Sequence, residues 1–158
     1  TFTESVKGCD TFIQLLGVSH PGPGKGAEFR SIDLVSVTES VLAAKTCSVK
    51  HFIYLSVAEP APVMKEYIEV RKQGEEMIRN SGMNSAFIKP WYVLGPGHYW
   101  PYLILPVYWI FMLIPGFSRT ARRLYPVKIG NVLGAIVHSV ENPAGGIKNY
   151  STKELRKF

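Results

Sequence analysis

Residues 51–94 read HFIYLSVAEPAPVMKEYIEVRKQGEEMIRNSGMNSAFIKPWYVL, with an apolar run at each end and a helix-length segment between them. The first run, His51–Val57, shows no clean alternation of polar and apolar residues, which is typical of a strand covered on both faces. The second run, Ser85–Leu94, leads into Gly95-Pro96-Gly97 and is also predicted as a strand. Two strands joined by a helix predict a right-handed βαβ unit, and therefore a parallel sheet.

The connecting segment is predicted as a helix that runs from about Val63 to Asn80. Pro60 and Pro62 break the chain before it, and Gly82 supplies the stop signal after it. A helix of this length can carry the chain back across the sheet, as the connection between two parallel strands requires.

Further apolar runs extend the pattern toward both ends of the chain. Thr11–Gly17 and Ile147–Tyr150 are predicted as strands. Glu28–Lys45 is predicted as a helix buried over much of its circumference, and a last helix is stopped by Pro143. The apolar residues that define these two helices are Phe29, Ile32, Leu34, Val35, Val37, Val41 and Leu42, and Val132, Leu133, Ile136, Val137 and Val140. Alternating strands and helices predict an α/β fold with a doubly wound parallel sheet.

Composition limits the class of protein. The chain has 158 residues, of which 46% are hydrophobic and 19% charged, and its mean hydropathy is +0.06. This is enough for one domain with a core, and its apolar character indicates a buried sheet or a membrane contact. The net charge of +6 and the pI near 9.4 suit a phosphate-bearing ligand, a nucleic acid or an anionic membrane. No nucleic-acid partner is expected, because the chain has no Lys/Arg-rich block and its aromatic residues are not interleaved with basic ones.

The cysteines and histidines offer no metal-ligand or redox spacing, so no metal site is expected. Cys9 and Cys47 are predicted as free, buried thiols in a reducing compartment. His20 is a lone histidine in the Pro- and Gly-rich stretch Ser19–Gly26, which is predicted as a flexible loop. These features favour a cytoplasmic location, with a peripheral membrane location as the alternative.

Three residues of this framework bring reactive groups together. Ser56 ends the first apolar run, so its hydroxyl lies at the end of a predicted buried strand. Tyr67 and Arg71 follow one helical turn apart, on one face of the next helix. Ligands of doubly wound sheets bind beyond the carboxyl ends of the strands, where Gly17, Ser56 and Pro90 are expected to meet. The sequence therefore predicts a ligand site at this edge of the sheet.

Five strings follow one another along the chain: DTFIQLLG, HFIYLSVAEP, Tyr67-x-x-x-Arg71 with Gly74-Glu75, FIKPWYVLGPG and PVKIGNV. In this order they resemble the later two-thirds of an atypical or extended short-chain dehydrogenase/reductase. The group includes the sugar-nucleotide epimerase-like and NmrA-like proteins and a respiratory complex I accessory subunit. The resemblance covers about Asp10 to Val140 and implies a Rossmann-like fold that binds NAD or NADP.

The resemblance also implies roles for single residues. In the family a Tyr gives or takes a proton, a Lys one turn later lowers the pKa of that Tyr and binds the nicotinamide ribose, and a Ser positions the substrate oxygen. Tyr67, Arg71 and Ser56 are the matching catalytic candidates, with Arg where the family has Lys. Arg keeps a fixed charge and does not readily relay a proton, because its pKa lies above about 12. The implied cofactor-binding residues are Leu16, Gly17, Val18, Ser56, Tyr67, Arg71, Pro90, Trp91, Tyr92 and Val93.

The same residues also have purely structural explanations. Tyr67 could pack in the interior while Arg71 pairs with a carboxylate such as Glu75, and Ser56 could close its strand with a local hydrogen bond. Two readings of the function therefore stay open. One is an epimerase, dehydratase or oxidoreductase that moves a hydride to or from a hydroxyl or carbonyl. The other is a non-catalytic module that senses a cofactor or assists assembly.

The family's opening strand and G-x-x-G-x-x-G turn have no counterpart in this sequence. Pro21–Gly26 is rich in glycine, but its two prolines remove N–H donors. We therefore expect a Rossmann core truncated at its N-terminus over residues 1–97, followed by a small substrate-region segment over residues 98–158. The strand Thr11–Gly17 would then have an open edge, which predicts self-association.

Tyr99–Phe117 is a stretch without a single charged residue. Its length suits a membrane span, but three prolines within it would break hydrogen bonds that lipid cannot replace. It is predicted as an apolar wall of the substrate pocket, with an interfacial membrane segment as the alternative. Three basic residues follow at once and could meet lipid phosphates or the diphosphate of a small-molecule substrate. They are Arg119, Arg122 and Arg123.

Overall fold

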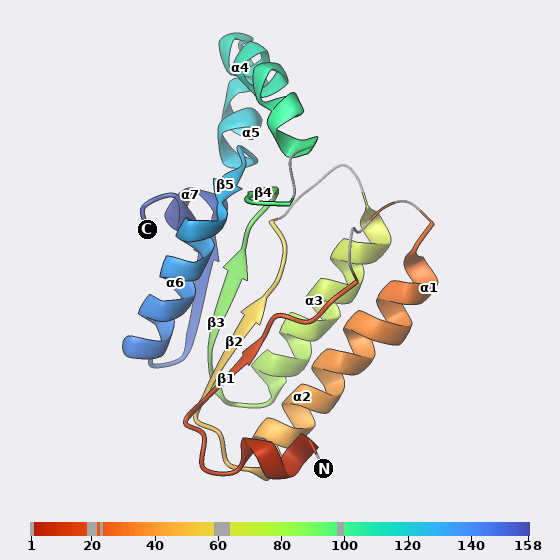
Figure 1. The fold of residues 1–158 in the computed structure, drawn as a ribbon, viewed down its shortest axis with the longest axis vertical. Coiled ribbons are helices and arrows are strands. Elements are labelled where there is room, and N and C mark those ends of the chain that lie inside the picture. The colour runs from red at the N-terminus through yellow and green to blue at the C-terminus, as the bar shows by residue number, and fades with distance from the viewer. Residues whose placement is uncertain (1, 19–21, 23, 59–63, 98–99) are drawn as a thin grey trace.

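The computed structural model describes residues 2–18, 22, 24–58, 64–97 and 100–158. Its centre is a parallel sheet with the strand order β1-β2-β3-β6, and a separate short ladder pairs β4 with β5 (Figure 1). The strands are β1 (Thr11–Gln14), β2 (His51–Leu55), β3 (Asn84–Lys89), β4 (Val93–Leu94), β5 (Val127–Lys128) and β6 (Ile147–Ser151).

Helices cover both faces of the sheet (Figure 1). On one face, α2 (Val35–Thr46) and α3 (Lys65–Asn80) pack over side chains that include Phe52, Tyr54 and Phe87. On the other face, α6 (Ile129–Glu141) packs over side chains that include Ile53, Ala86 and Ile88. The continuous apolar run of β2 is thereby explained, and the predicted doubly wound α/β fold is confirmed.

The register brings three strand ends to one edge of the sheet. Gln14 of β1 pairs with Tyr54 of β2, and Tyr54 pairs with Phe87 of β3. Because all three strands run in the same direction, the residues that follow them leave the sheet together. We call this the carboxyl edge. It is formed by Leu15–Val18, Ser56–Ala58 and Pro90.

Two glycines set the position of α3. A Cβ on Gly74 would lie 2.6 Å from the Tyr54 hydroxyl oxygen, so the missing side chain lets the helix approach β2. Gly82 follows the helix with a φ of +78°, a conformation that suits glycine and ends the helix where the sequence predicts. The predicted helix start at Val63 lies outside the described residues.

Two predicted strands are longer than the strands of the structure. Beyond Gln14 the N–H groups of Leu16 and Val18 donate to side chains, not to a neighbouring strand, so β1 ends before Gly17. The predicted strand Ser85–Leu94 is divided into β3 and β4, because Pro90 has no N–H with which to continue a ladder.

The predicted apolar faces of two helices are partly wrong. Ile32, Val35 and Leu42 are exposed on the helical segment that ends in α2, and Leu133, Val137 and Val140 are exposed on α6. Each helix has the sheet on one side only, so its outer residues face solvent. The thiol prediction is also wrong in part, because Cys9 is exposed and Cys47 is half-buried, although both are free.

The remaining elements are short. The helical segment before α2 consists of α1 (Gly26–Glu28) and a π-helical turn (Phe29–Leu34), and 3-10 turns cover Phe2–Val6 and Trp100–Ile104. The two helices α4 (Leu105–Leu113) and α5 (Ser118–Arg123) form a hairpin that projects away from the sheet, and α7 (Thr152–Leu155) lies near the C-terminus (Figure 1). In the part of the chain that the structure describes, no helix has both the length and the apolar character to cross a bilayer.

Candidate functional site

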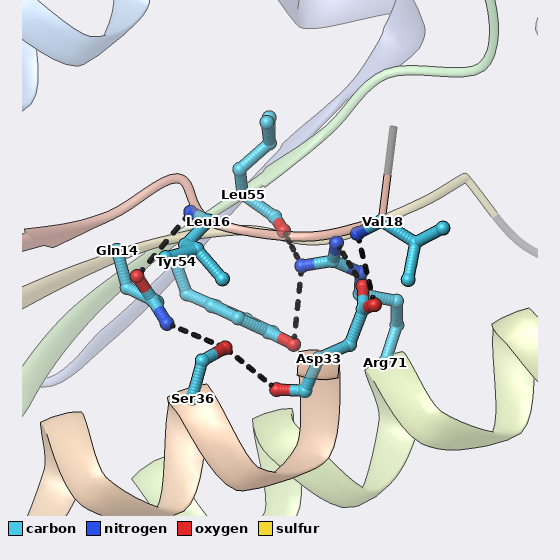
Figure 2. Close-up of polar contacts among 8 residues, drawn as sticks. All are labelled: Gln14, Leu16, Val18, Asp33, Ser36, Tyr54, Leu55 and Arg71. Atoms are coloured by element: carbon cyan, nitrogen blue, oxygen red, sulfur yellow. Dashed lines mark hydrogen bonds and ion pairs between the residues drawn. The ribbon is translucent and has the colours of Figure 1, made fainter. Parts of the chain in front are cut away.

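A buried ion pair lies under the carboxyl edge. Arg71 Nη2 donates to Asp33 Oδ1 at 2.5 Å, and both side chains are almost fully buried (Figure 2). Arg71 Nη1 donates to the backbone oxygen of Leu55 at 2.9 Å, at the end of β2. The second carboxylate oxygen of Asp33 accepts the N–H of Val18 at 3.0 Å. One charged pair therefore joins the end of β2, the segment after β1 and two helical segments.

Gly17 lies directly against this ion pair. A Cβ built on Gly17 would overlap the Arg71 guanidinium and the Asp33 carboxylate. Glycine is therefore required at this position because the chain's own charged side chains fill the adjacent space. The family resemblance implies that Gly17 binds a cofactor, whereas in the structure the ion pair fills the space beside its Cα.

The charges around Arg71 keep it protonated. Burial disfavours the charged guanidinium, but Tyr67, Tyr54 and Asp33 outweigh burial and raise the pKa of Arg71. Burial also raises the pKa of Tyr54, and the charge of Arg71 opposes that shift. The Nε–H of the guanidinium lies in the interior without an acceptor among the described residues.

A second buried carboxylate, that of Glu75, lies one turn further along α3. The Ser56 hydroxyl donates to Glu75 Oε1 at 2.5 Å, and Lys89 Nζ donates to Oε2 at 2.7 Å. Arg79 Nη2 also reaches Oε2, at 3.4 Å. The alternative in which Arg71 pairs with a carboxylate is therefore confirmed, but that carboxylate is Asp33 and not Glu75, which binds Ser56 and Lys89.

Tyr67 lies in the first turn of α3 and is partly exposed. Its ring centroid is 5.1 Å from that of Phe29 and 5.2 Å from Cζ of Arg71. The aromatic face of Tyr67 thus lies against the guanidinium. In the described part of the chain no hydrogen bond joins Tyr67 to Ser56. The structure therefore brings Tyr67 and Arg71 together. Ser56 is hydrogen-bonded to Glu75, whereas Arg71 is paired with Asp33.

Pro90–Val93 continues the carboxyl edge toward the projecting hairpin. The backbone oxygen of Pro90 accepts the N–H of Ala58 at 2.9 Å, and Trp91 Nε1 donates to the Tyr108 hydroxyl at 3.0 Å. The Trp91 and Tyr92 rings pack 5.1 Å apart, and Val93 begins β4. Partial burial raises the pKa of both Tyr92 and Tyr108. Gly17, Ser56 and Pro90 therefore lie at one edge of the sheet.

Sequence reasoning missed Asp33, which holds the site together. The residue occupies the π-helical turn Phe29–Leu34, and such turns often accompany functional sites. One signal was available, since Phe29, Asp33 and Val37 are spaced four residues apart and all three are buried. A carboxylate inside an apolar helical stripe indicates a buried cationic partner.

No protein-family model and no curated protein matches this sequence. Solved structures do match, and one is the Bordetella bronchiseptica enzyme WbmH in complex with NAD+, at 18% identity and a TM-score of 0.63, covering 90% of this chain and 52% of that chain. A second is UDP-glucuronic acid 4-epimerase from Bacillus cereus in complex with NAD, at 14% identity and a TM-score of 0.67, covering 96% and 56%. A third is a short-chain dehydrogenase/reductase superfamily protein from Agrobacterium tumefaciens with bound NAD, at 12% identity and a TM-score of 0.66, covering 94% and 62%.

At these identities the likeness shows a shared fold. The chain spans between 52% and 62% of the length of these three proteins. Almost the whole chain takes part in the match, so the carboxyl edge belongs to the shared architecture.

Proposed function

We propose that this chain binds NAD or NADP at the carboxyl edge, as a protein of the short-chain dehydrogenase/reductase type. The observation that carries the proposal is the meeting of Gly17, Ser56 and Pro90 at one edge of a doubly wound sheet, where such folds bind their ligands. The fold is shared with three proteins whose structures hold NAD, which supports the choice of ligand.

The residues present fit the nicotinamide end of a dinucleotide. Leu16, Val18 and Tyr92 offer apolar surface at the edge, and each is at least partly exposed. The Nε–H of Arg71 is buried without an acceptor among the described residues, so a ribose hydroxyl that reached it through the carboxyl edge would satisfy this donor. The backbone of Gly17 can approach a ligand closely on the side away from the ion pair.

The proposed substrate is a nucleotide sugar, and the proposed step is hydride transfer at one of its hydroxyl or carbonyl groups. The bound dinucleotide would accept or supply the hydride. The Tyr67 hydroxyl would give or take the proton at the substrate oxygen, with the Arg71 guanidinium holding its ring in place. Ser56 donates its own proton to Glu75, which leaves the lone pairs of its oxygen to accept from a substrate hydroxyl.

One observation favours a non-catalytic role as the second candidate. The charge of Arg71 is balanced by Asp33, and Arg does not readily relay a proton as Lys does. A site of this kind could hold a dinucleotide and respond to its presence without turning it over.

Calorimetric titration with NADH and NADPH tests the proposal on the whole chain. Saturable binding, together with a raised melting temperature, is the expected result. The variant Tyr67→Phe should still bind the dinucleotide and lose at least about a hundredfold in turnover of a nucleotide sugar, since it lacks the hydroxyl proton. Binding without turnover in the unaltered chain would select the non-catalytic role, and no binding of either dinucleotide would refute both roles.

A further inference from the structure

The helix α4 is apolar at every position and buried at none. Its sequence is LPVYWIFML, and none of its nine residues is buried in the protein. A helix that is hydrophobic all round normally lies inside a protein or in a membrane. Water is a poor solvent for such a surface, so a partner is expected to cover it.

The exposed surface has a fixed shape because the hairpin is held at several points. The Phe111 and Phe117 rings pack 5.7 Å apart between α4 and the start of α5. At the base, the Tyr108 hydroxyl accepts from Trp91 and its ring packs 5.8 Å from that of Tyr125. The tip of the hairpin points away from the sheet (Figure 1). We call this exposed apolar surface the tip; it comprises Trp109, Ile110, Leu113, Ile114 and Phe117.

The hairpin itself carries only positive charge. No Asp or Glu occurs in the sequence between Met77 and Val140. Arg119 and Arg122 are exposed on α5, directly after the apolar stretch. The interface of an anionic bilayer has apolar acyl chains beneath negatively charged headgroups. An apolar surface next to exposed cations complements such an interface.

We infer that the α4–α5 hairpin seats its tip in the interface of an anionic lipid bilayer. At about 1.5 Å per residue, the nine residues of α4 extend roughly 14 Å, about half the ~30 Å of a hydrocarbon core. The hairpin therefore enters one leaflet without crossing. Trp109 lies where the headgroups meet the acyl chains, a position that suits the amphipathic indole.

Charge decides between a bilayer and a second copy of the chain. Two tips packed against each other would bring their arginines together, with no carboxylate from residues 77–140 to compensate them. A bilayer that contains phosphatidylserine supplies the opposite charge, worth about 1 kcal/mol for each basic residue near its surface.

Vesicle flotation of the whole chain tests this inference. The vesicles contain either phosphatidylcholine alone or an equal mixture of phosphatidylcholine and phosphatidylserine. The unaltered protein should float with the mixed vesicles, and the double variant Trp109→Ser/Leu113→Ser should bind them at least tenfold more weakly. The control is Leu42→Ser, since Leu42 on α2 is about as exposed as Trp109 but lies outside the hairpin, and this variant should bind like the unaltered protein.

Two further measurements complete the test. The variant Arg119→Gln/Arg122→Gln should lose the preference for mixed vesicles, and all variants should melt like the unaltered protein because the changed side chains are exposed. Loss of flotation in Leu42→Ser as well would overturn the inference, as would failure of the unaltered protein to float with either vesicle. The inference would also be overturned if the protein formed a dimer without lipid and Leu113→Ser dissociated that dimer. A second copy of the chain would then be what covers the tip. None of these three results bears on dinucleotide binding.

Discussion

The strand β2 and the helix α4 are both apolar, yet they end in opposite environments. Four of the five residues of β2 are buried, whereas none of the nine residues of α4 is. Helices lie on both sides of β2, and α4 packs mainly against α5 and the turn before it. The interior around β2 also encloses charged groups, each with a fixed partner. Changes near β2 should therefore alter folding stability, and changes on α4 should alter association.

The ion pair beneath β2 gives the largest expected effect. The variant Arg71→Met leaves the Asp33 carboxylate buried without its cation, which should lower the free energy of unfolding by about 3–5 kcal/mol. Leu113→Ser on α4 should change it by no more than about 0.5 kcal/mol, because that side chain is exposed. Urea unfolding followed by circular dichroism measures both.

The double variant Arg71→Met/Asp33→Leu is the control for this prediction. It removes both charges, so it should recover most of the stability lost in Arg71→Met. If Arg71→Met were as mild as Leu113→Ser, the buried pair would not be the element that stabilises this edge.

Gly17 offers a sharper test of packing at the same edge. In Gly17→Ala the new methyl would overlap the Arg71 guanidinium, which should cost about 1–3 kcal/mol of unfolding free energy. Gly130→Ala on α6 is the matched control, since open space surrounds that position and alanine is the better helix former. Equal effects of the two substitutions on the urea midpoint would argue against close packing at Gly17.

The edge strand β1 is intermediate between the buried strand β2 and the exposed helix α4, because it is part of the sheet and still carries exposed apolar residues. Ile13 and Leu15 are exposed, and β1 pairs on one side only within the described sheet. We propose that the chain self-associates through this edge, and that Ile13→Lys weakens self-association about tenfold, or about 1.4 kcal/mol. Sedimentation equilibrium measures this, with Leu42→Lys as a control of similar exposure. A monomer at every concentration would contradict the proposal.

The smallest expected effect lies at the other end of β2. Burial lowers the pKa of His51 below its ordinary value of 6.5, so the folded protein favours the neutral ring. Above the pKa of His51 in the unfolded chain, the neutral ring costs the folded protein no stability. As the pH falls from that pKa through the lower pKa of the folded protein, the free energy of unfolding decreases. Urea unfolding between about pH 7 and pH 5 should show this decline, and His51→Gln should flatten it. An identical slope in both proteins would exclude His51 as its source.

The sequence predicted the framework better than the contacts. Apolar runs, prolines and glycines were sufficient for the parallel strands and for the end of α3 at Gly82, because these signals are local. The pairing of Arg71 with Asp33 joins residues 38 positions apart and depends on how the helices lie across the sheet. Local spacing favoured Glu75, which the structure assigns to Ser56 and Lys89. The exposure of α4 could not be predicted from the sequence either, since hydropathy does not show which other elements cover a helix.

Amide chemical-shift mapping with NADH most directly tests the central claim that the carboxyl edge holds the cofactor. We expect the largest shifts on Leu16–Val18 and Trp91–Val93, while the amides of Ile110–Leu113 at the tip stay unchanged. Saturable shifts confined to the tip, or no shifts at any concentration of NADH, would contradict it.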